Sequence, residues 1–146
     1  MTAVIARPVP IPASHLDLLT RPVCGVFTTL GDDGLPQSSL VWVDHDGECA
    51  RVNTTLERQK GRNLLANTNV SLLVVDPDNT SRFIQIRGDA ELVADGALEH
   101  LDALTRKYTP HPCFYGWIYP VEQQERETRI SCRIHARRIT LDAIHA

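Results

Sequence analysis

The chain has 146 residues, a mass of 16.3 kDa and a formal net charge of -3 at pH 7. This length suits a single domain over residues 1–146, with enough core to need no disulfides, and the negative charge argues against a general nucleic-acid-binding protein. No apolar run approaches the roughly 20 residues that span a bilayer, and residues 1–12 lack the order of a signal peptide. We therefore expect a cytoplasmic protein with a flexible N-terminal arm over residues 1–12 and no membrane or nucleic-acid partner.

The first elements are a short helix and a strand. Ser14 can cap a helix over residues 15–19, and Pro22 stops it. Residues 23–30 are apolar and β-branched, which favours a strand.

Two turns then predict a run of neighbouring strands. Residues 31–36 are dense in glycine, aspartate and proline, and a strand over residues 37–44 returns from them. A second turn at residues 44–47 leads into a strand over residues 49–55. The order predicts a β-meander.

The second half adds two strands, a helix and a closing strand. Residues 70–75 are continuously apolar, and residues 83–92 alternate around Gly88, which indicates a bend or bulge. Residues 97–108 place leucines on one helical face, and residues 129–144 alternate again. Alternation with one polar face predicts a mainly β protein, an antiparallel barrel of six to seven strands with flanking helices.

The helix expected over residues 57–67 begins with a concentration of cations. Arg58 and Lys60 lie beside backbone amides that favour an anion, so this helix start is suited to a phosphate. Only two of the fifteen basic residues are lysines, so Lys60 stands where arginine is the usual choice. The alternative is an ordinary solvated charged face. Leu64 and Leu65 are expected to turn inward.

Cysteines and histidines give no metal or nucleophile motif. Cys24 and Cys49 lie in apolar runs and are expected to be buried structural thiols. His111 and Cys113 are close together, but no second pair of ligands accompanies them. The aromatic run over residues 113–119 suits core or interface packing, or a wall for a flat ring ligand.

Several spaced blocks carry a family resemblance over nearly the whole chain. The blocks are Gly34-x-Pro36-Gln37-Ser38-Ser39, Val52-Asn53-Thr54, Arg58-x-Lys60-x-x-Asn63-Leu64, Val70-Ser71-Leu72 and Ile86-Arg87-Gly88-Asp89-Ala90. In this order they resemble the pyridoxamine 5′-phosphate oxidase-like flavin and deazaflavin oxidoreductases, and most of all the branch that depends on coenzyme F420. The resemblance implies a split β-barrel, a homodimer and a cofactor groove at the subunit interface.

The resemblance also implies which residues hold the cofactor. Arg58, Lys60 and Asn63 would hold its phosphate or the neighbouring oxygens, in agreement with the charge pattern of that helix start. Asn53 and Thr54 would line the ribityl chain and the phosphate.

Further residues are implied along the ring. Gln37, Ser38 and Ser39 would offer an amide and hydroxyls to its pyrimidine edge. The segment 115–119, with Trp117, and Arg129 would reach the ring from the partner subunit.

The implied chemistry is hydride transfer from reduced F420 to a small or planar organic acceptor, with FMN as the alternative cofactor. The cofactor supplies the reactive carbon, so no catalytic side chain is expected. A non-catalytic protein that binds flavin or deazaflavin is the other reading. Vitamin B6 oxidation is not expected, because no dedicated substrate-binding segment follows Arg138.

Overall fold

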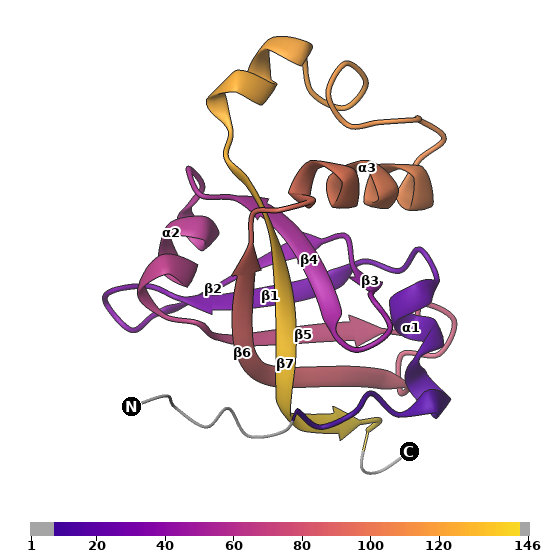
Figure 1. The fold of residues 1–146 in the computed structure, drawn as a ribbon. Helices are drawn as coiled ribbons and strands as arrows, with labels where there is room; N and C mark the ends of the chain where they lie inside the picture. The colour runs from indigo at the N-terminus through magenta and orange to yellow at the C-terminus, as the bar shows by residue number, and fades with distance from the viewer. Residues whose placement is uncertain (1–7, 144–146) are drawn as a thin grey trace.

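The computed structural model describes residues 8–143, and its centre is one strongly curled antiparallel sheet (Figure 1). Its seven strands lie in the order β2-β1-β5-β6-β7-β4-β3. The strands are β1 (Gly25–Leu30), β2 (Pro36–Val41), β3 (Asp44–His45), β4 (Ala50–Thr55), β5 (Asn69–Val75), β6 (Phe83–Val93) and β7 (Arg129–Leu141). This is the mainly β split barrel with flanking helices that the sequence predicts.

Short helices surround the sheet. They are η1 (Ala13–His15), α1 (Asp17–Thr20), α2 (Gln59–Ala66), α3 (Ala97–Tyr108) and η2 (Val121–Arg126). Figure 1 shows α3 across one end of the sheet, where it packs on β4 and β7, and the segment with η2 beyond it. Among residues 8–143, no helix is long and apolar enough to cross a membrane.

The main core lies inside the curl of the sheet, and alternate residues of each strand point into it. On β6 the inward set includes Ile84 and Ile86, which are fully buried, because successive side chains of a strand face opposite sides. A second cluster lies under α3, where Leu101 packs with Phe114 and Tyr115. The leucine face expected on this helix is confirmed.

The long strands β6 and β7 change direction at a bulge. Their register shifts between Arg87 and Gly88, as the sequence predicts for Gly88. A Cβ atom at Gly88 would overlap the carbonyl oxygen of His135 on β7, so only glycine allows this approach.

The predicted β-meander is right for its first hairpin, because β1 pairs with β2, and wrong for its third strand. Residues 37–44 do not form one strand, because β2 ends at Val41 and Val43 is fully buried in the core beyond it. β4 pairs with β7 and with the two-residue β3, while β2 lies at the opposite edge of the sheet. The turn residues between neighbouring segments do not reveal that β4 pairs with β7, a strand almost eighty residues further along the chain.

Three local predictions are also wrong. Ser14 does not cap a helix, because a 3₁₀ turn begins at Ala13, and the Ser14 hydroxyl lies 2.8 Å from Nδ1 of His15 instead. Leu65 is 64% exposed, because α2 turns only Leu64 toward the core. Cys24 is exposed just before β1, whereas Cys49 is buried as expected.

The expected N-terminal arm lies only partly within the described residues. Residues 1–7 are outside them. Val9, further along the arm, donates its amide hydrogen to the carbonyl of Ala136 on β7 over 2.8 Å.

Candidate functional site

A groove of about 260 Å³ opens between the edge strand β2, the end of β4, the start of α2 and helix α3. One end is cationic and is formed by Arg58, Lys60 and Arg129. The remaining wall is apolar and aromatic: Cys24, Leu40, Val41, Trp42, Leu101, Leu104, Phe114, Ile118 and Tyr119, with Asn53 between the two regions. An anionic group and a flat apolar ring are the kinds of ligand that such a lining fits.

The position of the cationic end follows from a tight connection between β4 and α2. β4 ends at Thr55, and α2 begins at Gln59 with Arg58 as its N-cap residue. Gly61 lies against the carbonyl of Thr55, where any Cβ atom would overlap it. The helix therefore starts close to the strand, and the side chain of Lys60 reaches across to β2.

Lys60 is a half-buried cation with few partners. Its Nζ donates a hydrogen bond to Oγ of Ser39 over 3.1 Å. Burial lowers the pKa of Lys60, and the neighbouring charges of Arg58 and Arg129 lower it further. No carboxylate among residues 8–143 forms an ion pair with Lys60. A bound anion would supply the missing charge.

The two arginines are held in place by protein groups. Glu127 lies 2.8 Å from Arg129 and 3.8 Å from Arg58. Burial alone would raise the pKa of Glu127, but hydrogen bonds from Tyr115 and Arg129 lower it, so this side chain is a carboxylate. The arginines are thus partly neutralised and positioned, while Lys60 is not.

The guanidinium groups of Arg58 and Arg129 also contact aromatic rings. Arg58 donates to the hydroxyl of Tyr119 and lies 5.5 Å from the centre of its ring. The Arg129 guanidinium lies 4.8 Å from the ring centre of Phe114. Both contacts are within the range of cation–π attraction. They tie the segment after α3 to the cationic end of the groove.

The structure gathers five of the ten predicted cofactor residues around the groove. Ser39 contacts Lys60 there, and Asn53, Arg58, Lys60 and Arg129 line it.

The amide residues Gln37 and Asn63 lie together in a neighbouring recess beside the turn at residues 31–36. Asn63 is only 2% exposed and donates to Oγ1 of Thr29 over 3.0 Å and to Oε1 of Gln37 over 3.3 Å. In this arrangement its amide connects α2 to β1 and β2.

Three further predicted residues lie away from the groove. Ser38 points to the other face of β2, where its hydroxyl lies 2.7 Å from that of Thr28. Thr54 is 2% exposed on the core side of β4, and its hydroxyl has no hydrogen-bond partner among the described residues. Trp117 is 56% exposed and stacks on His111 with ring centres 5.0 Å apart.

Sequence reasoning named the aromatic run over residues 113–119 as a candidate wall for a flat ring, and Phe114, Ile118 and Tyr119 of that run line the groove, but it missed Trp42. Trp42 stacks on Tyr108 with ring centres 5.5 Å apart and meets Phe114 edge to face. Trp42 lies between Val41 and Val43, so its sequence neighbours do not distinguish a ring contact from core packing. Tyr119 belongs to the aromatic run that the sequence analysis singled out.

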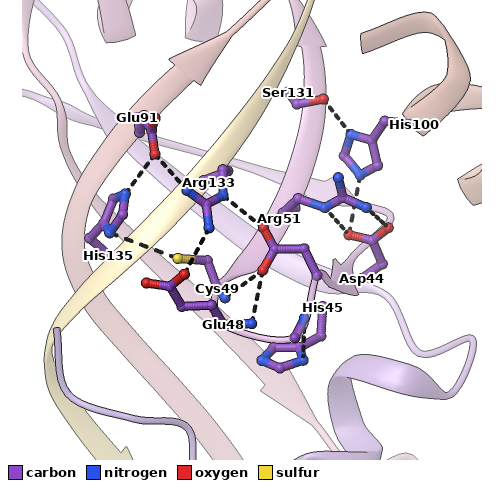
Figure 2. Close-up of polar contacts among 12 residues, drawn as sticks. Asp44, His45, Glu48, Cys49, Arg51, Glu91, His100, Ser131, Arg133 and His135 are labelled. Atoms are coloured by element: carbon purple, nitrogen blue, oxygen red, sulfur yellow. Dashed lines mark hydrogen bonds and ion pairs between the residues drawn. The ribbon is translucent and has the colours of Figure 1, made fainter. Parts of the chain in front are cut away.

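A separate polar cluster contains the buried thiol of Cys49 (Figure 2). Its Sγ lies 3.8 Å from Nδ1 of His135, whose Nε2 lies 2.8 Å from Glu91. Burial raises the pKa of this thiol, so it is a neutral packing group rather than a nucleophile. No group of three histidine, cysteine or acidic side chains within residues 8–143 could hold a metal ion.

The curled sheet defines a split-barrel protein, and the groove combines a cationic end with an aromatic wall. The family model described as pyridoxamine 5′-phosphate oxidase matches residues 11–140, and the chain belongs to that family.

Solved structures agree with this assignment. An F420 reductase is 31% identical, with a TM-score of 0.74, over 89% of this chain and 98% of its own. The conserved hypothetical protein Rv2991 from Mycobacterium tuberculosis is 27% identical, with a TM-score of 0.67, over 97% of this chain and 89% of its own. HupZ of Group A Streptococcus, at 18% identity and a TM-score of 0.61 over 90% of this chain and 93% of its own, shares the fold. No curated protein matches the sequence.

Proposed function

We propose that the protein is an oxidoreductase that binds coenzyme F420 in this groove and transfers a hydride from it to a small or planar organic acceptor. FMN is the alternative cofactor. Family membership and the similarity to an F420 reductase support an oxidoreductase of the flavin or deazaflavin type. The observation that carries the proposal is Lys60, a half-buried cation at the end of an aromatic groove with no carboxylate partner in the described part of the chain.

The residues present fit such a cofactor. Lys60 and the two arginines suit its phosphate, because charge-assisted hydrogen bonds to phosphate are strong in a partly desolvated site. Trp42 and Tyr119 suit a flat ring. The ring system, when bound, supplies the carbon or nitrogen that carries the hydride.

The chain itself contributes binding, orientation and exclusion of water. Arg58 and Arg129 are fixed by Glu127 before any ligand arrives, so little ordering is needed on binding. The aromatic wall keeps water from one side of the ring, which favours hydride transfer over side reactions. We assign no side chain as a catalytic acid, base or nucleophile.

The groove of one chain is smaller than most ligand pockets, which run from about 300 to 1,000 Å³. Leu40 lines it and is nevertheless 75% exposed. Both observations support a homodimer in which a second chain completes the groove, and we propose this assembly for a cytoplasmic enzyme. Light scattering at micromolar concentration is expected to give twice 16.3 kDa; a monomer that still binds cofactor would contradict it.

The test of function is titration of the purified protein with F420 and with FMN, followed by an assay with reduced F420 and a panel of quinones and enones. We expect F420 to bind more tightly than FMN and the reduced form to be oxidised only when an acceptor is present. Tight binding without turnover on any acceptor would favour the non-catalytic binding protein. Binding of neither cofactor would refute the proposal.

A further inference from the structure

A buried polar array adjoins the groove through Asn53, which lines the groove and contacts His100. His100 on α3 is 4% exposed, and Figure 2 shows its ring between Ser131 on β7 and Asp44 on β3. Nδ1 of His100 lies 2.7 Å from the Ser131 hydroxyl, and Nε2 lies 3.2 Å from Oδ1 of Asp44. Asn53 joins the array, with its Nδ2 3.2 Å from Nδ1 of His100.

The orientation of the Asn53 amide follows from two unambiguous neighbours. The carbonyl of Ala97 can only accept, and it lies 2.9 Å from Nδ2. The guanidinium of Arg129 can only donate, and it lies 3.4 Å from Oδ1. Nδ2 therefore faces α3, and Oδ1 faces the cationic end of the groove.

This orientation determines the role of Nδ1 of His100. Because Nδ2 of Asn53 is a donor, Nδ1 is the acceptor of the ring, and its one lone pair is shared between the Ser131 hydroxyl at 2.7 Å and the more distant Asn53 amide at 3.2 Å. A hydrogen on Nδ1 would point at the amide hydrogens of Asn53.

The contacts of Nε2, on the opposite side of the His100 ring, also indicate that Nε2 carries the hydrogen and Nδ1 does not. Asp44 forms two hydrogen bonds with Arg51, of 2.9 and 2.8 Å. The Arg51 guanidinium can only donate, so both oxygens of Asp44 accept; burial alone would raise the pKa of Asp44, but its hydrogen bonds lower it. Nε2 of His100 therefore carries the hydrogen.

Serine, histidine and aspartate in this order resemble the proton relay of a hydrolase, but the surroundings do not. Ser131 is 4% exposed and does not line the groove, so no substrate reaches its hydroxyl. Asn53 is the one member of the array that lines it.

We propose that His100 is a positioning residue, which fixes the Asn53 amide so that its carbonyl oxygen faces the groove as a hydrogen-bond acceptor beside the cations. The ligand class recognised there carries a hydroxyl or N–H donor close to an anionic group. That the ligand is a flavin or deazaflavin rests on the proposed function; the positioning itself does not.

The prediction for the free protein is a single His100 tautomer and one fixed Asn53 amide. Nitrogen-15 NMR of the protein without cofactor is expected to show a hydrogen on Nε2 and none on Nδ1, and slowly exchanging side-chain amide hydrogens of Asn53. A hydrogen on Nδ1 at neutral pH would overturn the proposal.

Two substitutions separate positioning from packing. His100→Asn keeps an acceptor oxygen near the place of Nδ1, whereas His100→Leu removes it. We expect His100→Leu to lose the slow exchange of the Asn53 amide and to weaken cofactor binding about three- to ten-fold, and His100→Asn to restore most of both. Equal loss in both variants, with the fold intact by circular dichroism, would show that His100 only fills space.

The matched controls are His135→Asn and His135→Leu, in the separate cluster around Cys49 and outside the groove lining, which should change neither readout. If neither F420 nor FMN binds the unmodified protein, the proposed function fails, while the NMR comparison still decides the role of His100.

Discussion

Nζ of Lys60 on α2 and Oγ of Ser39 on β2 lie 3.1 Å apart, so the first turn of the helix is joined to the edge strand across the groove. A lysine ammonium has three hydrogens, and Ser39 takes one of them. Arg58 and Arg129 add charge of the same sign nearby. This corner of the molecule therefore concentrates positive charge, and we expect an anion to bind there.

Replacement of Lys60 by alanine should weaken cofactor binding strongly. Loss of a charge-assisted hydrogen bond costs roughly 1.5 to 3 kcal/mol, or about ten- to a hundred-fold in affinity. Isothermal titration measures this. Arg62→Ala is the control, because Arg62 lies on the same helix but its side chain is exposed and donates to Glu57 and Gln59 rather than into the groove. An unchanged dissociation constant for Lys60→Ala would make the helix start a solvated charged face.

Cofactor affinity should also depend on pH through Lys60. In the free protein its pKa is lowered from the usual 10.5 by burial and by Arg58 and Arg129. A bound anion favours the charged form and raises that pKa. Affinity is therefore full below the pKa that Lys60 has in the free protein, and it falls as the pH rises through that pKa. Because this pKa is lowered, the fall begins at a lower pH than for an ordinary lysine.

Titration from about pH 7 to 10 tests this, with Lys60→Arg for comparison. Arginine keeps its charge over this range, so the variant should lose the decline while it still binds. Identical pH profiles for the two proteins would show that another group is responsible.

Lys107 has a different role from the one its sequence position indicates. At the end of a helix it would only favour the negative helix terminus. Its Nζ instead donates to the carbonyls of Leu19 and Val43, over 2.6 and 2.5 Å, and so ties α3 to α1 and to the chain between β2 and β3.

Lys107→Ala should therefore destabilise the protein without a direct effect on the groove. Loss of both bonds should cost about 1.5 to 3 kcal/mol, which lowers the melting temperature by about 5 to 10 °C in a chain of this size. Scanning calorimetry measures it, and Arg106→Ala, an exposed neighbour, should shift it little. Equal melting temperatures for the two variants would contradict this role.

Local pattern predicted the elements well, because each depends on neighbouring residues. Alternation located β6 and β7, and helical spacing located α3 with Leu101 and Leu104 toward the core. Gly88 marked the bulge. Lys60 could be singled out because a helix start and a rare lysine coincide in the sequence.

Long-range geometry could not be predicted in the same way. The pairing of β4 with β7 and the apolar wall from Trp42 depend on contacts between distant segments. The directions in which Asn63 and Thr54 point depend on how α2 and β4 pack against the rest of the sheet. In a strand, a register shift of one residue turns a side chain to the opposite face of the sheet. The family resemblance placed both at a cofactor, whereas packing turns both inward.

The close approach of α2 to β4 can be tested at Gly61. In an isolated helix, replacement of glycine by alanine stabilises by about 0.5 to 1 kcal/mol. Here the new Cβ would overlap the carbonyl of Thr55 and the backbone of Leu56, neither of which can rotate away. Gly61→Ala should therefore destabilise by about 1 to 3 kcal/mol. It should also weaken cofactor binding, because the displaced helix carries Lys60 away from Ser39.

Thermal unfolding and titration of the same sample measure both effects, and Ala66→Ser, at the exposed end of α2, is the control. A more stable Gly61→Ala variant with unchanged affinity would mean that α2 does not lie against β4 as tightly as the structure has it.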